Sequence, residues 1–149
     1  MSSGRPYVIG LGSPHGDDQA GWLVVEALRL RGWNASEARN VAQPVDVLDT
    51  LPVDRPLLLC DAANGESVGA FRTWSWPTME LPTLKPSGSH NMPLASVLEL
   101  ARQLRLLNGS VVVKTIDGKN WTSFSKASEA VELAARKLAD EIDGGYPNA

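Results

Sequence analysis

The sequence predicts an α/β protein, a three-layer sandwich in which helices cover both faces of a mostly parallel, twisted sheet, in a single domain that spans residues 1–149. Three observations predict this class. Apolar runs typical of strands alternate along the chain with segments whose apolar residues recur at helical spacing. Two of the strand runs, PLLLCDAA from Pro56 and SVVVKTI from Ser110, are apolar without alternation, as in strands buried on both faces of a parallel sheet. A length of 149 residues with an apolar fraction of 43% suits one core.

The first half of the chain is expected to begin with a short strand, Tyr7 to Ile9, followed by a helix from Ala20 to about Arg31 whose apolar residues fall on one face. A second strand is expected between Asn34 and Val41, although NASEARNV has little β character. A short helix follows from Pro44 to Leu51, because proline is favoured in the first turn of a helix. The buried strand from Pro56 to Ala63 then ends in the sequence Cys-Asp-Ala-Ala.

In the second half, the mixed pattern of 69–76 predicts an edge strand, and 77–89 is a long loop that leads to His90. The next helix presents an apolar face that includes Leu94, Leu98 and Leu104, and it is expected to end at the Asn-Gly pair 108–109. The strand 110–116 and a polar connector follow. Ser125 is the expected N-cap of the last helix, which the glycines at 144–145 end.

The glycine-rich stretch YVIGLGSPHGDDQAG, from Tyr7 to Gly21, joins the first strand to the first helix and carries the adjacent carboxylates Asp17 and Asp18. One interpretation is a dinucleotide site, but the glycine spacing differs from that fingerprint, and two carboxylates at a helix start would repel a pyrophosphate. A second is that one of the two acids caps the following helix. A third is a catalytic or metal-binding carboxylate held by a rigid loop. The loop alone does not distinguish these interpretations.

Charge and composition exclude several classes of protein. The net charge of −3 and the sequence pI of about 5.3 give no indication of a nucleic-acid partner. No apolar run approaches the roughly 20 residues that span a membrane, and MSSGRPYVIG lacks the features of a signal peptide. The single cysteine, Cys60, excludes an internal disulfide framework and a cysteine cluster for metal, and no disulfide-linked partner is expected. The expectation is a cytoplasmic protein.

Three positions carry the side chains best suited to chemistry. These are the pair Asp17 and Asp18 after the first strand, Asp61 at the end of the buried strand, and His90 at a helix entrance; the other histidine, His15, lies in the first loop. The loops after parallel strands meet at one edge of a sheet, so the carboxylates are expected to lie close together there. Two carboxylates and an imidazole suit a divalent metal ion with open coordination positions. Capping by Asp61 and a backbone contact of His90 are the structural alternatives.

These segments resemble the hydrogenase maturation proteases. The matching pieces are VIGLGSPHGDDQAG, LLLCDAANG and SHNMPLASVLELARQL, followed by SVVVKTI and SKASEAVELAARKLADEI, and their order and spacing agree from about Arg5 to Ile142. Members of this family are nickel-dependent endopeptidases that remove the C-terminal extension from the large subunit of [NiFe] hydrogenases. The resemblance therefore implies a hydrolase of this kind, with the [NiFe] hydrogenase large-subunit precursor as its partner.

Carried over residue by residue, the resemblance implies that Asp18, Asp61 and His90 are metal ligands. Asp17 is the neighbouring carboxylate available as a general base, so Asp17, Asp18 and Asp61 are the candidate catalytic residues. The ion is expected to be Ni²⁺ carried by the substrate, with Zn²⁺ or Cd²⁺ as substitutes in vitro. The chain departs from the family at RNVAQP, residues 39–44, where Asn40 stands in place of an expected Asp.

Two other functions remain open at this stage. A non-catalytic, metal-sensing maturation protein could use the same fold, because fold does not fix function. Peptidyl-tRNA hydrolases also begin with a strand and a Gly-Leu-Gly turn, but the acidic chain offers no basic track for RNA.

Overall fold

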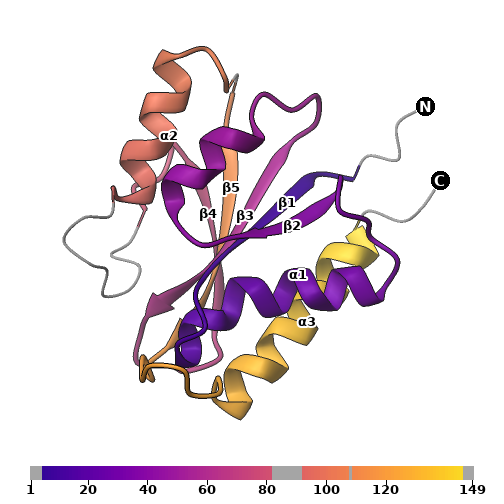
Figure 1. Cartoon of the computed structure of the whole chain (residues 1–149), viewed down its shortest axis with the longest axis vertical. Helices are drawn as coiled ribbons and strands as arrows, with labels where there is room; N and C mark the ends of the chain where they lie inside the picture. Colours follow the sequence, from indigo (N-terminus) through magenta and orange to yellow (C-terminus); the bar gives the residue numbers. More distant parts are fainter. Residues whose placement is uncertain (1–4, 82–91, 108, 146–149) are drawn as a thin grey trace.

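Five strands form one sheet in the computed structural model, which describes residues 5–81, 92–107 and 109–145 (Figure 1). The order across the sheet is β2-β1-β3-β5-β4. The strands are β1 (Tyr7–Leu11), β2 (Ala38–Val41), β3 (Leu57–Asn64), β4 (Phe71–Trp76) and β5 (Val111–Gly118). All neighbours pair in parallel except β4, which runs antiparallel to β5. The mostly parallel sheet and the edge position of β4 confirm the prediction.

Helices cover both faces of this sheet. They are α1 (Ala20–Leu30), α2 (Leu94–Gln103) and α3 (Glu129–Gly145), with two 3₁₀ helices, η1 (Gly16–Gln19) and η2 (Pro44–Thr50). Helices α1 and α3 lie together on one face, and α2 lies with η2 on the other (Figure 1). The predicted three-layer α/β sandwich is therefore correct.

The alternation of side chains along the strands divides the core into two parts. In β3, Leu58 and Cys60 pack under α1 and α3, whereas Leu57 and Leu59 pack under α2, and all four are at most 4% exposed. Burial on both faces explains why this strand reads as an uninterrupted apolar run. The same division fixes which face Asp61 occupies, because it follows Leu59 by two residues.

Helix α2 is shorter than the sequence predicts. It ends at Gln103, and Leu104, which is predicted on its apolar face, is 57% exposed. Arg105 adopts a left-handed conformation with φ 59°, and the N–H of Leu106 donates back to the carbonyl of Ala101 at 2.9 Å. This left-handed turn ends the helix before the Asn-Gly pair.

The last helix starts later than predicted, and Ser125 is not its N-cap. Helix α3 begins at Glu129, and the carbonyl of Ser125 instead accepts hydrogen bonds from the N–H of Gly16 and from Gln19 Nε2, at 3.0 and 2.8 Å. These contacts dock the connector between β5 and α3 onto η1. The N–H of Ser128, the residue just before α3, donates to Asp17 at 2.8 Å, so a distant carboxylate holds the start of the helix in place.

Candidate functional site

The loop between β1 and α1 lies directly against the carboxyl end of β3. Two glycines allow this approach: a Cβ atom on Gly10 would lie 2.4 Å from the carbonyl oxygen of Gly21, and one on Gly21 would lie 2.3 Å from that of Cys60. Because neither position has room for a side chain, the start of α1 packs on the backbones of β1 and β3, and η1 contacts β3. The structure therefore brings η1, with Asp17 and Asp18, to the strand that carries Asp61.

Asp18 is half-buried at the turn that follows β1. The hydroxyl of Ser13 donates a short hydrogen bond to its carboxylate, and the N–H of Ser13 donates to its carbonyl oxygen at 3.2 Å. These bonds hold the residue over the end of β1. Neither Asp17 nor Asp18 caps α1, whose N-cap is Gln19.

Asp17 points the other way, into the connector between β5 and α3, and is 1% exposed. One carboxylate oxygen accepts the N–H groups of Lys119 and Asn120 at 2.9 and 3.0 Å. The other accepts the N–H and the hydroxyl of Ser128, both at 2.8 Å. Burial alone would raise the pKa of this carboxyl, but the hydrogen bonds outweigh it and hold the pKa below its ordinary value. With four bonds to the connector, Asp17 has a structural role here; its role as a general base stays a prediction.

Asp61 lies in β3, is 2% exposed, and accepts a hydrogen bond from the N–H of Ala62 at 2.8 Å. It follows Leu59 by two residues and so occupies the face of the sheet that α2 covers. Across the sheet, Asp61 is in register with Thr115 of β5, and Thr115 is in register with Arg72 of β4. The three form one row of adjacent side chains on one face, and we call Asp61, Thr115 and Arg72 the polar row.

Sequence reasoning missed most of the polar row. Thr115 is fully buried, and its hydroxyl oxygen accepts a hydrogen bond from the indole Nε1 of Trp74 at 3.1 Å. Arg72 donates to Asp117 at 3.3 Å, and Asp117 belongs to β5, which extends two residues beyond the predicted strand. The alternation of β4 was a usable signal, because it places Arg72 on the same side as Trp74.

The two histidines differ in what the structure says of them. His90 lies outside the described residues, and within 5–81, 92–107 and 109–145 no group of three acidic, histidine or cysteine side chains could hold a metal ion. The set Asp18, Asp61 and His90 therefore stays a prediction. His15 is described: its Nδ1 accepts the N–H of Phe124 at 3.0 Å, and the two rings make an edge-to-face contact at 4.7 Å. Nε2 is then the protonated nitrogen of the neutral ring.

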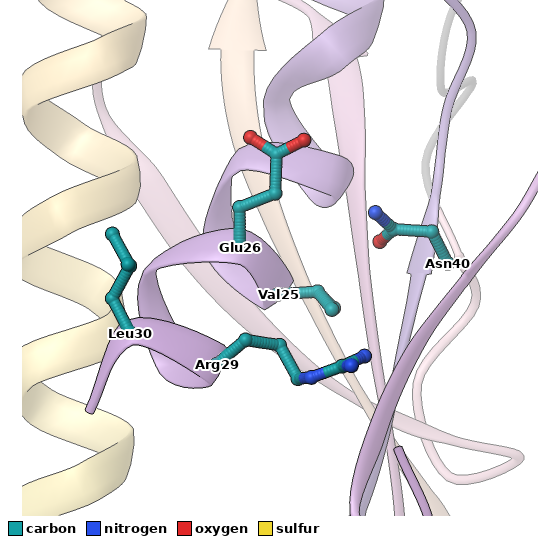
Figure 2. A pocket seen from close by; sticks show the side chains of 5 residues that line it. All are labelled: Val25, Glu26, Arg29, Leu30 and Asn40. Atoms are coloured by element: carbon teal, nitrogen blue, oxygen red, sulfur yellow. The ribbon is translucent and has the colours of Figure 1, made fainter. Parts of the chain in front are cut away.

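A pocket of about 640 Å³ lies on another part of the surface, between α1 and β2. Figure 2 shows its lining side chains, Val25, Glu26, Arg29, Leu30 and Asn40. Asn40 reaches it from the face of β2 that packs under α1, opposite to the face that holds Asp61, and its Oδ1 is buried without a hydrogen-bond partner in the described part of the chain. This pocket and the predicted carboxylates are thus separate.

The fold matches that of several solved proteins named as endopeptidases or hydrogenase maturation proteases. HycI from Escherichia coli aligns with a TM-score of 0.75 at 20% identity, covering 96% of this chain and 92% of its own. HybD from E. coli aligns with a TM-score of 0.73 at 18% identity, covering 95% and 91%. HycI from Thermococcus kodakarensis KOD1 aligns with a TM-score of 0.71 at 21% identity, covering 95% and 91%.

At these identities the comparisons establish a common fold over almost the whole chain, in agreement with the resemblance seen in the sequence. No protein-family model matches the sequence, and no curated protein matches it. In the described ranges, none of the helices is long and apolar enough to cross a membrane.

Proposed function

We propose that this protein is a nickel-dependent endopeptidase that removes the C-terminal extension from the large-subunit precursor of a [NiFe] hydrogenase after metal insertion. The observation that carries the proposal is the contact between η1 and β3, which joins the loop bearing Asp18 to the strand bearing Asp61. It occurs in a fold shared with proteins named as a hydrogenase maturation protease and a hydrogenase maturating endopeptidase.

The chemistry of the donor set supports nickel as cargo of the substrate. Asp18 and Asp61 offer oxygen ligands, and His90 would add a nitrogen ligand. Three protein ligands leave coordination positions for groups of the precursor, so an ion already held by the precursor can be contacted without a complete site in the protease. An ion bound there would polarise a carbonyl or activate water.

The test is cleavage of the precursor, followed by mass spectrometry of the intact subunit. The purified protein is incubated with nickel-loaded and with metal-free precursor, and we expect shortening of the loaded form alone. Asp61→Asn should abolish cleavage, whereas Asp49→Asn, an exposed carboxylate on η2, should leave it unchanged. A nickel-loaded precursor that remains intact with the wild-type protein contradicts the proposal.

Metal ligation is tested separately by calorimetric titration of Ni²⁺, Zn²⁺ and Cd²⁺. Saturable binding that is lost in Asp18→Ala, Asp61→Ala and His90→Ala, but kept in His15→Ala, is the expected result. Loss in His15→Ala alone would assign the imidazole ligand to the first loop. Unchanged affinity in both Asp61→Ala and His90→Ala would refute the predicted ligand set.

One observation favours a second candidate, a metal-sensing maturation protein that binds the precursor without cutting it. Asn40 stands where the resemblance leads one to expect an Asp, and an amide cannot act as a base. Its buried Oδ1 lacks a hydrogen-bond partner in the described residues. Tight binding of the nickel-loaded precursor, without shortening of the precursor, would favour this candidate. If the Asn40→Asp variant then cut the precursor, Asn40 would be the reason that the wild type does not.

A further inference from the structure

The end of the polar row on β4 has features of a binding site for an anionic group. Arg72 is the exposed member of its ion pair: its side chain is 56% exposed, whereas that of Asp117 is 4% exposed. Within the described part of the chain, its guanidinium has this one carboxylate contact, at 3.3 Å. Because a guanidinium carries five N–H donors in a fixed fork, most of them are available for a ligand.

The position of Arg72 is set by the sheet. Arg72 is in register with Thr115, but its guanidinium contacts Asp117, two residues closer to the carboxyl end of β5. The side chain therefore leans toward the edge of the sheet where the parallel strands end. Trp74, two residues further along the same face of β4, is fixed by its hydrogen bond to Thr115.

The distribution of charge explains what would bind there. Asp61 and Asp117 are buried carboxylates at this edge, and Asp18 lies on η1, which packs on the same strand as Asp61. An anionic group of a ligand is repelled by these carboxylates and attracted by Arg72, so it has one favourable place along the row. Such a combination of attraction and repulsion fixes the register of a bound chain.

The distance along the row sets how far this group lies from Asp61. Arg72 and Asp61 are on strands separated by β5, and two interstrand spacings amount to about 10 Å. An extended peptide covers that span with about three residues. We propose that Arg72, with Asp117 behind it, forms a subsite for a carboxylate of the substrate, an acidic side chain or a chain terminus about three residues from the bond that is cut. The proposal rests on the proposed function, because it takes Asp61 to lie beside that bond.

The test compares steady-state cleavage of the nickel-loaded precursor by variants at this position. Arg72→Gln is expected to raise KM about tenfold and to change kcat less than twofold, because it removes binding and leaves Asp61 in place. Arg72→Lys should recover part of the loss, since it keeps the charge without the fork. The matched control is Arg136→Gln, an exposed arginine on α3, which should behave as the wild type.

A purely structural role for Arg72, as the counter-ion of Asp117, is separated by the double variant Arg72→Gln/Asp117→Asn. That variant no longer buries an unpaired charge, so it should unfold at the wild-type temperature and still show the raised KM. A KM that returns to the wild-type value together with the unfolding temperature would overturn the subsite. So would an Arg72→Gln single variant whose KM is within twofold of the wild type.

Substitutions in the precursor identify the carboxylate that Arg72 binds. Each Asp and Glu near the cleavage site of the precursor, and its terminal carboxylate, is replaced in turn by the amide. One replacement should raise KM with the wild-type protein and have no effect with Arg72→Gln; if none does, the proposal is wrong.

If the wild type does not cut the precursor, the proposed function fails, and the subsite is then tested by a binding measurement. This measurement is fluorescence anisotropy with a fluorescein-labelled peptide that spans the cleavage site. Weaker binding by Arg72→Gln supports the subsite, and equal or no binding overturns it.

Discussion

Replacement of Asp17 by asparagine should destabilise the fold without changing its shape. The carboxylate accepts two hydrogen bonds on each oxygen, from Lys119 and Asn120 on one and from the N–H and hydroxyl of Ser128 on the other. An amide has one oxygen and cannot accept at its nitrogen. The best orientation keeps the oxygen toward Lys119 and Asn120 and donates from the nitrogen to the Ser128 hydroxyl, which leaves the N–H of Ser128 without an acceptor.

The size of the effect follows from these contacts. A hydrogen bond to a charged group contributes about 1.5–3 kcal/mol, and a buried N–H without a partner costs a comparable amount. We therefore expect Asp17→Asn to lower the free energy of unfolding by about 3 kcal/mol, a large part of the total stability of an ordinary domain. Ser128→Ala removes the hydroxyl bond alone and should cost about 1.5 kcal/mol, the lower end of that range.

The measurement is urea unfolding at neutral pH, followed by far-UV circular dichroism and tryptophan fluorescence. The slopes with denaturant should be equal, so that the shift in midpoint reports stability. If Asp17→Asn costs less than Ser128→Ala, then the four hydrogen bonds do not hold the connector as described.

The pH dependence gives an independent check of the same carboxylate. The pKa of Asp17 is lower in the folded protein than in the unfolded chain, so its contribution is fully present at neutral pH. It is lost as the pH falls below about 4 and through the folded pKa. The difference between wild type and Asp17→Asn should therefore shrink on acidification, and a constant difference would exclude a charged Asp17 as its source.

Three further outcomes are expected. Leu58→Asp, at a position 4% exposed, should prevent folding, and a soluble variant with cooperative unfolding would contradict the assignment of β3 to the core. Burial raises the pKa of the Cys60 thiol to about 12, so a thiol reagent at pH 8 should label it only after addition of urea, and rapid labelling of the folded protein would show an opening of the sheet. Gly16→Ala should cost at least about 2 kcal/mol, because Gly16 has φ 58° and its Cβ would lie 2.2 Å from the carbonyl oxygen of Asn120, whereas Gly144→Ala, with open space around it, should be neutral or stabilising.

The fold could be predicted from the sequence because the apolar runs of its central strands are compatible with few other structures. Strand β3 is buried on both faces, and an apolar run of that length between turn residues is compatible with few other positions in a soluble domain. Strand β2 was uncertain for a physical reason. The residues ARNV have weak β preference, and the strand forms because β1 offers its backbone groups in register, from Val8 opposite Ala38 to Leu11 opposite Val41.

The site was predictable in part. The acidic residues near the ends of parallel strands were expected to lie at one edge of the sheet, because that geometry follows from topology, and the contact between η1 and β3 brings their segments together. Arg72 and Asp117 were missed because their significance depends on the pairing of β4 with β5, and the register of two strands whose connection includes α2 cannot be read from local pattern. The start of α3 was misplaced for a similar reason: Ser128, the residue just before it, is held by Asp17, 111 residues earlier in the chain.

The adjacent acids Asp17 and Asp18 look equivalent in the sequence, yet the fold points them in different directions. In a 3₁₀ helix successive side chains are about 120° apart, so when one carboxylate enters the connector the next must face elsewhere. Asp18 is half-buried, is hydrogen-bonded to Ser13, and lies near the end of β1.

The two acids should therefore have different roles, which a cleavage assay and an unfolding measurement can distinguish. Asp18→Asn should abolish cleavage and metal binding while its free energy of unfolding stays within about 1 kcal/mol of the wild type, because the amide oxygen can still accept the hydroxyl of Ser13. Asp17→Asn should lower both stability and cleavage, and its cleavage should recover at low temperature, where the connector is again held in place. Loss of stability in Asp18→Asn as large as that in Asp17→Asn would mean that both acids are structural, and the chemistry would then have to be sought elsewhere on this edge.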